Sequence, residues 1–180
     1  GATGPQGNVG ATGLTGATGQ TGLGFTIART YSSVAALLAD DVIVEEKLDG
    51  ANLGISLDSD GQLRPQNRGQ YLCDPYAGQF SRLPSWLAQH AEALYSVLTH
   101  DLILFGEWCA ARHSLDYAAL PDWFLLFDVY DRSVGRFWST SRRNILARNT
   151  GLLTVPQVMH GKFTLSKLKT VVMDTPSHYR

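Results

Sequence analysis

The sequence has little charge imbalance, few cysteines and no long apolar stretch, and each of these absences excludes a class of protein. Its 180 residues carry 15 Lys and Arg against 16 Asp and Glu, which excludes a polybasic nucleic-acid-binding protein but not a local basic groove. Cys73 and Cys109 are too few for a disulfide framework or a four-cysteine zinc site. No apolar run approaches the roughly 20 residues of a membrane helix, and no secretory signal is visible. We therefore expect a cytoplasmic protein with reduced thiols.

Glycine is concentrated in the first 24 residues, where it occupies every third position from Gly1 to Gly22. This is the collagen period, in which only glycine fits at the crowded axis of three packed chains. Threonine fills many of the other positions and Pro5 is the only proline of the segment, so a triple helix formed here would be weak. Residues 1–24 are predicted to be a collagen-like Gly-X-Y segment able to form a homotrimer, or else a flexible linker.

Residues 25–180 have the composition and patterning of one globular domain. Apolar periodicity predicts strands at 41–47, 52–57, a short segment ending at 67, 102–108, 123–130 and 154–159, and helices at 84–98, 139–149 and 164–173. Asp49-Gly50 is predicted to form a tight turn between the first two strands, and Asp60-Gly61 another. Ser139 or Ser141 would cap the second helix, and Gly151 would end it. Because the strands cluster like hairpins, we expect an α+β fold with antiparallel or mixed sheets and flanking helices.

Lys47 is the first residue that could carry chemistry, because it ends a predicted strand in the stretch E-E-K-L-D-G-A-N. A lysine amine is a nucleophile only when it is unprotonated. A metal ion or a basic group near bound phosphates would favour that form, whereas Glu45, Glu46 and Asp49 would oppose it unless they engage a metal or a ligand. The alternative is an ordinary exposed hairpin with Lys47 at its shoulder.

Three further stretches place polar or aromatic side chains at strand ends or turns. Glu107 ends an apolar strand after F-G, and a carboxylate buried there needs a partner such as a ribose hydroxyl. Phe127 alternates with the inward-facing Leu126, so its ring could stack on a base. Arg68, in N-R-G, has a fork of donors suited to phosphate. The simpler interpretations are a strand-end Glu that faces water, a Phe in the core and a surface Arg.

In their order and spacing, the four stretches resemble the covalent nucleotidyltransferase superfamily, and most closely the ATP-dependent RNA ligases of the RNA-repair type. K-L-D-G at 47–50 is similar to the first motif of that family, and Asn52 matches an asparagine shortly after it. N-R-G at 67–69, F-G-E at 105–107 and F-D-V at 127–129 are similar to the motifs that follow. The resemblance covers about residues 42–180 and implies an ATP-grasp-like adenylation domain.

The resemblance also implies a reaction and a set of partners. Lys47 would attack the α-phosphate of ATP and keep AMP as a phosphoramidate, AMP would pass to a 5′-phosphate on RNA, and a 3′-hydroxyl would displace it to seal the strand. Glu107 would hold the ribose, Phe127 would stack on adenine and Arg68 would contact phosphate. The residues that would complete the nucleotide site are Glu46, Asp49 and Asn52. Mg²⁺ is the implied ion because hard oxygen ligands select it, and no residue is identified as its ligand.

The family also has an E-G motif whose carboxylate binds metal, followed by a motif with two lysines that hold the phosphates. Neither motif is found after F-D-V in the 180 residues, and Lys162, Lys167 and Lys169 lack the context of the lysine pair. We therefore expect a partial domain, cut before the E-G motif, with little or no adenylylation activity. Two other interpretations stay open: a collagen-like structural protein that carries an inactive ligase-like domain, and a DNA ligase or mRNA-capping guanylyltransferase.

Overall fold

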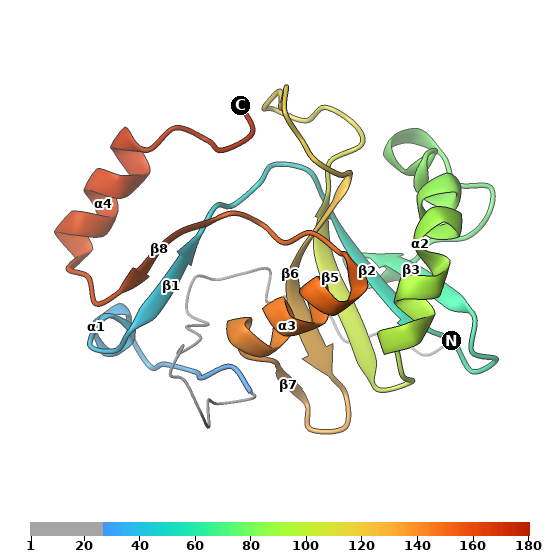
Figure 1. The fold of residues 1–180 in the computed structure, drawn as a ribbon, viewed down its shortest axis with the longest axis horizontal. Coiled ribbons are helices and arrows are strands. Elements are labelled where there is room, and N and C mark those ends of the chain that lie inside the picture. Colours follow the sequence, from blue (N-terminus) through green and yellow to red (C-terminus); the bar gives the residue numbers. More distant parts are fainter. Residues whose placement is uncertain (1–26) are drawn as a thin grey trace.

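The computed structural model describes residues 27–180, and the predicted collagen-like segment 1–24 lies outside them. These residues form two antiparallel sheets and four α-helices, so the predicted α+β class is confirmed (Figure 1). The strands are β1 (Val42–Glu45), β2 (Ala51–Leu57), β3 (Leu63–Asn67), β4 (Gln70–Tyr71), β5 (Leu102–Trp108), β6 (Phe124–Asp131), β7 (Arg136–Phe137) and β8 (Gln157–Gly161). The helices are α1 (Val34–Leu38), η1 (Gly78–Phe80, a 3₁₀ turn), α2 (Leu83–Val97), α3 (Thr140–Thr150) and α4 (Leu165–Asp174).

The larger sheet has six strands in the order β4-β3-β2-β5-β6-β7. Its central strands β2, β5 and β6 read as apolar runs, and Leu53, Leu104 and Leu126 from these three strands have no exposed surface. They pack against Trp86 of α2 and Leu146 of α3 in the main core. Both helices therefore contribute to the core on one side of this sheet, and α2 lies along it at the right of Figure 1.

The helix boundaries follow from local sequence. Pro84 lies in the first turn of α2, where its missing N–H has no cost. The Ser139 hydroxyl accepts the N–H of Arg142 and caps α3, so Ser139 and not Ser141 is the cap. Gly151 ends α3 in a left-handed conformation with φ 71°, as glycine allows. None of the helices within residues 27–180 is long and apolar enough to cross a bilayer.

The tight turn predicted at Asp49-Gly50 is wrong, because the strands on its two sides belong to different sheets. β1 pairs with β8 in a two-stranded sheet, from Val42 opposite Gly161 to Glu45 opposite Gln157. Residues 46–50 carry the chain from this small sheet to β2 of the large one. Gly50 is required there for space: a Cβ atom would lie 2.5 Å from the carbonyl oxygen of Trp108.

β6 contains one extra residue beside Phe127. Residues 105–106 of β5 are consecutive, yet they pair with Asp128 and Leu126, so the register shifts by one residue. The side chains that enter the main core therefore change parity, from Leu126 before the bulge to Val129 after it. Phe127 packs instead against a second apolar cluster.

Candidate functional site

The second apolar cluster joins the K-L-D-G stretch to the F-D-V stretch. Its buried members include Leu48, which directly follows Lys47, together with Cys109 after β5 and Leu125 of β6. Phe127 is half-buried and packs against this cluster. Residues 46–50, which include Lys47, thus lie beside the bulge at Phe127. Both are at the junction of the two sheets.

Glu107 lies at the same junction, close to two other predicted site residues, Asn52 and Lys47. The pairing of β2 with β5 places Asn52 directly opposite Glu107, and the N–H of Gly50 donates to Glu107 Oε1 at 2.8 Å. Burial raises the pKa of Glu107 above its ordinary value, whereas the N–H of Gly50 and the charge of Lys47 lower it. Lys47 is exposed at the surface and close enough for its charge to act on this carboxylate.

Asp49 anchors the loop between β5 and β6. Its Oδ2 atom accepts the N–H of Ser114 at 2.8 Å and the N–H of Leu115 at 3.0 Å. Its own N–H donates to the hydroxyl of Tyr117 at 2.7 Å. The N–H of Leu115, followed by that of Ser114, holds the pKa of Asp49 below its ordinary value. One carboxylate oxygen of Asp49, which was predicted to bind the nucleotide, is thus already bonded to the protein backbone.

Glu46 is engaged in the same way by residues from the far end of the chain. Its carboxylate accepts the hydroxyl of Ser177 and, at 2.9 Å, the N–H of His178. The next residue, Tyr179, packs on the second apolar cluster, and its carbonyl oxygen accepts the N–H of Ala119 at 3.2 Å. The Glu46 side chain is therefore directed to residues 177–178, and its part in nucleotide binding stays a prediction.

Arg143 joins β1, β6 and α3, and the sequence analysis did not single it out. This arginine is 2% exposed, and its guanidinium forms a two-pronged ion pair with Glu45 and donates to the carbonyl oxygen of Phe127. It lies on the buried side of α3 with Leu146 and Ala147. That spacing of three and four residues is the pattern that could have placed Arg143 inside, although its charge suggested a surface residue.

Asp128, which follows Phe127 in the bulge, lies close enough to Arg143 and Glu45 for their charges to act on its carboxyl group. Burial raises the pKa of Asp128 to about 7, with Arg143 opposing the shift and Glu45 adding to it. This carboxyl group therefore keeps its proton to a higher pH than an ordinary aspartic acid.

Arg68 lies in a turn that is joined to Asn52 of β2. It is exposed at the turn between β3 and β4 with φ 48°, in the left-handed region that few side chains adopt. The neighbouring Asn67 side chain donates to the carbonyl oxygen of Asn52 at 2.6 Å, which ties this turn to β2. In residues 27–180 the Arg68 side chain forms no hydrogen bond or ion pair, so its guanidinium is available.

The free donors of this site fit a phosphate ligand better than a metal cage. The side chains of Lys47, Asn52 and Arg68 form no hydrogen bond with other described residues. Among those same residues, no group of three or more His, Cys, Asp and Glu is placed to hold a metal ion. The three free side chains can therefore donate to the oxygen atoms of a phosphate ligand.

The Cys109 thiol is not a candidate nucleophile. Burial, with the charges of Glu107 and Asp49 adding to it, raises the pKa of Cys109 to about 12. The thiol is therefore protonated at neutral pH, and only a thiolate is strongly nucleophilic.

A profile of the RNA ligase family matches residues 40–178. The chain belongs to the RNA ligase family. The matched range contains all four stretches singled out in the sequence, from K-L-D-G to F-D-V. No curated protein matches the chain.

Solved structures of RNA ligases share the fold. An archaeal ATP-dependent RNA ligase superposes with a TM-score of 0.57 in form 1, at 26% identity over 75% of this chain and 35% of that chain. Form 2 gives a TM-score of 0.54 at 26% identity, over 67% of this chain and 32% of that one. The present chain thus spans about a third of these ligases.

An RNA ligase of Naegleria gruberi with PPi gives a TM-score of 0.57 at 18% identity, over 74% of this chain and 41% of that one, and shows the fold alone. Mutants of that enzyme with ATP and Mn, and with AMP and Mn, give TM-scores of 0.56 and 0.55.

Proposed function

We propose that this chain carries the adenylylation site of an ATP-dependent RNA ligase, with Lys47 as the nucleophile. The observation that carries the proposal is the meeting of Lys47, Asn52 and Glu107 at the junction of the two sheets, next to Phe127. The sequence separates these residues widely, yet the fold gathers a free amine, a half-buried carboxylate, a free amide and an aromatic ring. These are the groups needed for attack on phosphorus, for binding a ribose hydroxyl and for stacking on a base.

Each residue has a role in the proposed reaction. The deprotonated amine of Lys47 attacks the α-phosphorus of ATP, a P–N bond forms, and pyrophosphate leaves with the electrons of the broken P–O bond. Glu107 accepts a hydrogen bond from the ribose, Phe127 stacks on adenine, and Arg68 and Asn52 donate to the nucleotide. A divalent ion bound with the triphosphate, Mg²⁺ in our proposal, neutralises phosphate charge.

The second substrate in this proposal is an RNA end. An oxygen of its 5′-phosphate attacks the phosphorus of lysyl-AMP and releases the amine of Lys47. A 3′-hydroxyl then attacks the activated 5′-phosphate, and AMP leaves as the strand is sealed. The family match and the fold shared with solved ATP-dependent RNA ligases support an RNA end as the second substrate.

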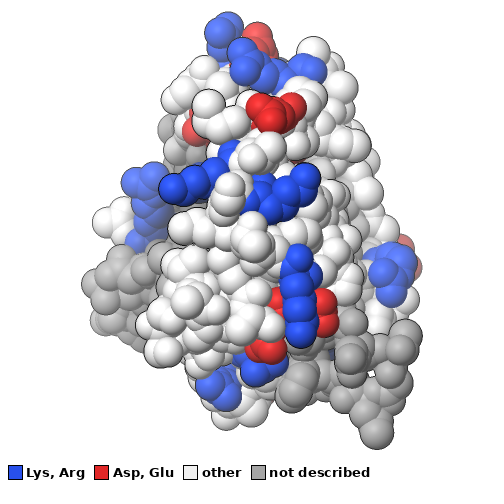
Figure 2. All heavy atoms as spheres, turned by 90° about the vertical axis from the view of Figure 1, so that its left-hand side faces the viewer, with Lys and Arg blue, Asp and Glu red and all other residues white. Residues whose placement is uncertain are grey.

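Charge distribution supports contact with a nucleic-acid backbone. Residues 132–180 contain nine Lys and Arg residues but a single acidic residue, Asp174, so the positive charge of a nearly neutral chain is concentrated at one end. Figure 2 shows Lys and Arg side chains at several places on the face that carries β1, β8 and α4, with smaller groups of Asp and Glu between them. Exposed cations on such a face can bind phosphates and release counterions.

The 180 residues lack the E-G motif and the lysine pair, and we infer that this chain alone adenylylates slowly. The test therefore has two readouts. The chain is incubated with α-labelled ATP and Mg²⁺ or Mn²⁺ and then denatured, and ATP binding is measured separately by calorimetry. We expect an acid-labile, alkali-stable label on Lys47 that is absent in Lys47→Ala, and ATP binding that weakens in Glu107→Ala.

Arg148→Ala is the control, because Arg148 is an exposed cation on α3 outside the candidate site. It should leave both readouts unchanged. A chain that neither takes the label nor binds ATP in a Glu107-dependent manner would contradict the proposal. Labelling by GTP in preference to ATP would indicate a guanylyltransferase instead.

A further inference from the structure

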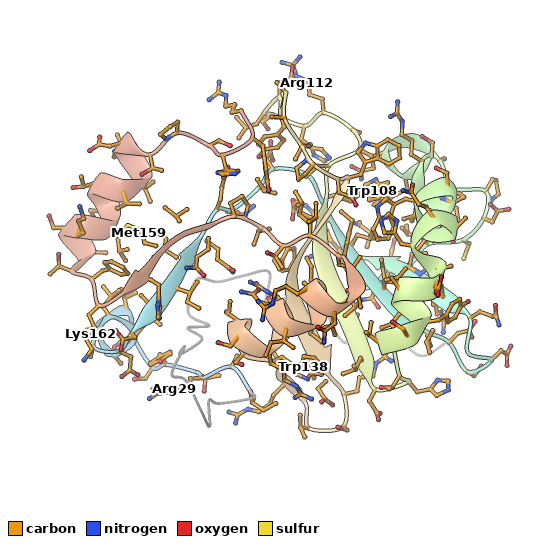
Figure 3. All side chains as sticks on the ribbon, in the orientation of Figure 1. Arg29, Trp108, Arg112, Trp138, Met159 and Lys162 are labelled. Carbon is orange, nitrogen blue, oxygen red and sulfur yellow. The ribbon has the colours of Figure 1, made fainter. Side chains whose placement is uncertain are left out.

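A separate pocket of about 530 Å³ opens between α2 and the loop that joins β5 to β6. It lies outside the group formed by Lys47, Asn52 and Glu107, none of which lines it. Its volume falls within the usual range for small-ligand sites. Figure 3 shows Arg112 at the outer tip of the loop and Trp108 deeper, towards α2.

One wall of the pocket is a rigid stack of rings. The rings of Trp86 and His90 are parallel to within 19°, with centroids 4.1 Å apart. His90 Nδ1 lies 2.9 Å from the carbonyl oxygen of Trp86, and its Nε2 lies 3.4 Å from Asp122 Oδ2. Asp122 Oδ1 also accepts the indole N–H of Trp86 at 2.7 Å. Both edges of the His90 ring are thus occupied, and a ligand can use only the face that Trp86 does not cover.

Two polar side chains of the pocket remain available for a ligand. Gln89 is exposed and forms no hydrogen bond within residues 27–180, so its amide can both donate and accept. Arg112 pairs with Asp116 at 3.5 Å, but both side chains are 69% exposed. An ion pair in that setting is weak, and a phosphate group can displace it.

The pocket and the Lys47 segment share one wall. The loop that carries Arg112 also contains Tyr117, which lines the pocket and whose hydroxyl accepts the N–H of Asp49. Cys109 also lines the pocket, and its Sγ would lie 3.0 Å from a Cβ placed on Gly50. A ligand in this pocket would therefore be held a short way from the K-L-D-G stretch.

We propose that this pocket holds one nucleotide of the RNA strand, with its base stacked on His90, its base edge bonded to Gln89 and its phosphate bound by Arg112. The proposal rests on the proposed function, because it supplies the RNA end for the site at Lys47. An aromatic face beside an amide that both donates and accepts suits a nucleobase, and the cation at the rim suits its phosphate.

The probe is a 5′-phosphorylated, single-stranded RNA hexamer that carries 4-thiouridine for photocrosslinking, used with the full 180-residue chain. Crosslinks are located by mass spectrometry, and the dissociation constant is measured by fluorescence anisotropy. We expect crosslinks in the peptides that contain Gln89, His90 or Trp123. Crosslinks confined to other parts of the chain would overturn the proposal.

Variants test the three contacts separately. His90→Ala should weaken binding roughly 5- to 100-fold, whereas His90→Phe, which keeps a ring face, should retain most of the affinity. Gln89→Ala should weaken binding several-fold, and Glu92→Ala, on the exposed side of the same helix, should not. Arg112→Ala should lower the salt dependence of binding by about one phosphate contact, while Asp116→Asn should leave affinity equal or higher.

An abasic nucleotide in the probe separates stacking from a merely structural effect of His90. The abasic probe should bind the wild-type chain more weakly, and this difference should disappear in His90→Ala. If the difference persists in His90→Ala, the base does not stack there and the proposal is wrong. If ATP rather than RNA crosslinks to the pocket, the site is a second mononucleotide site and the RNA assignment is wrong.

Lys47→Ala separates this proposal from the proposed function. It should abolish covalent labelling, and RNA binding in this variant should still depend on His90. Loss of labelling together with intact, pocket-dependent RNA binding supports both proposals. A wild-type chain that neither takes the label nor binds ATP, but still shows such RNA binding, would contradict only the first.

Discussion

The two sheets of this protein are held in different ways. Six of the seven residues of β5 are buried, as expected for a strand whose stability comes from apolar burial. β1 and β8 together contain a single buried residue, Val42, and β1 is tied to the rest of the fold by the ion pair between Glu45 and Arg143. The large sheet is thus an apolar core, whereas the small sheet is attached through polar contacts.

This difference matters because the candidate site takes residues from both sheets. Glu107 and Phe127 lie on strands of the large sheet, whereas Lys47 follows directly after β1 of the small one. Regions with few buried apolar contacts open at lower free energy than the core. We therefore expect Lys47, the proposed nucleophile, to be on the more easily displaced side of the candidate site.

Truncation of the large sheet should have the greatest effect on global stability. Leu126 has no exposed surface, and Leu126→Ala should lower the free energy of unfolding by about 2–5 kcal/mol through lost burial and a residual cavity. Leu165, which is 51% exposed on α4, is the matched control, and Leu165→Ala should cost less than about 0.5 kcal/mol. Urea denaturation measures both, and equal losses would contradict the comparison.

Loss of Arg143 should release the small sheet in particular. Arg143→Met leaves Glu45 without its partner, and breaking a largely buried pair costs about 3 kcal/mol. Hydrogen exchange should accelerate in β1 and β8 more than in β5. The double variant Glu45→Gln, Arg143→Met should recover much of the loss, because residue 45 then carries no unpaired charge. Uniform acceleration in all strands would show that the small sheet does not open separately.

Asp128 should make stability depend on pH. Burial raises its pKa to about 7 in the folded protein, above the ordinary value of roughly 4. The folded state therefore holds the proton more tightly than the unfolded state. The stability that protonated Asp128 contributes is fully present below about pH 4 and is lost as the pH rises through about 7. Asp128→Asn should flatten this dependence and stabilise the protein at pH 8 by on the order of 1–2 kcal/mol.

Thermal melts between pH 4 and pH 8 provide the measurement for Asp128→Asn. Asp174→Asn, which alters an exposed carboxylate on α4, serves as the control and should follow the wild-type curve. A wild-type melting temperature that rises steadily from pH 4 to pH 8, with an identical rise in Asp128→Asn, would contradict this account of the carboxyl group.

The smallest effect is expected at Glu46. Glu46→Gln replaces a charged acceptor by a neutral one and should weaken the hold on Ser177 and His178 by roughly 1 kcal/mol. Proteolysis after residue 174 should become faster, while the unfolding midpoint of the large sheet stays the same. If the midpoint falls as far as in Leu126→Ala, residues 177–178 support the whole fold and not a local segment.

Much of the large sheet could be predicted because each of its long strands is a recognisable apolar run in the sequence. The apolar runs at 102–108 and near 123–130 became β5 and β6, and Ser139 and Gly151 marked the ends of α3. The pairing of β1 with β8 could not be predicted, because nothing in either short strand specifies a partner so distant in sequence. The D-G pair at 49–50 therefore suggested a hairpin that does not exist.

The sequence was enough to propose which residues form the candidate site. It could not show which other residues their side chains contact. The alternation of Leu126 and Phe127 correctly placed Leu126 in the core. The sequence could not show that Glu46 and Asp49 are engaged by distant residues, because those bonds depend on the tertiary fold. Arg143 was missed because a charged residue at a core-facing helix position is uncommon.

The extra residue in β6 adds a side chain without changing which of its neighbours face the main core. Deleting Phe127 would restore simple alternation with Leu126 and Val129 still directed into that core, because the residues that pair with β5 would then be consecutive. The deletion would instead remove the aromatic ring that packs against the second apolar cluster. Engineers who graft this strand onto another scaffold would have to transplant the irregularity together with its ring.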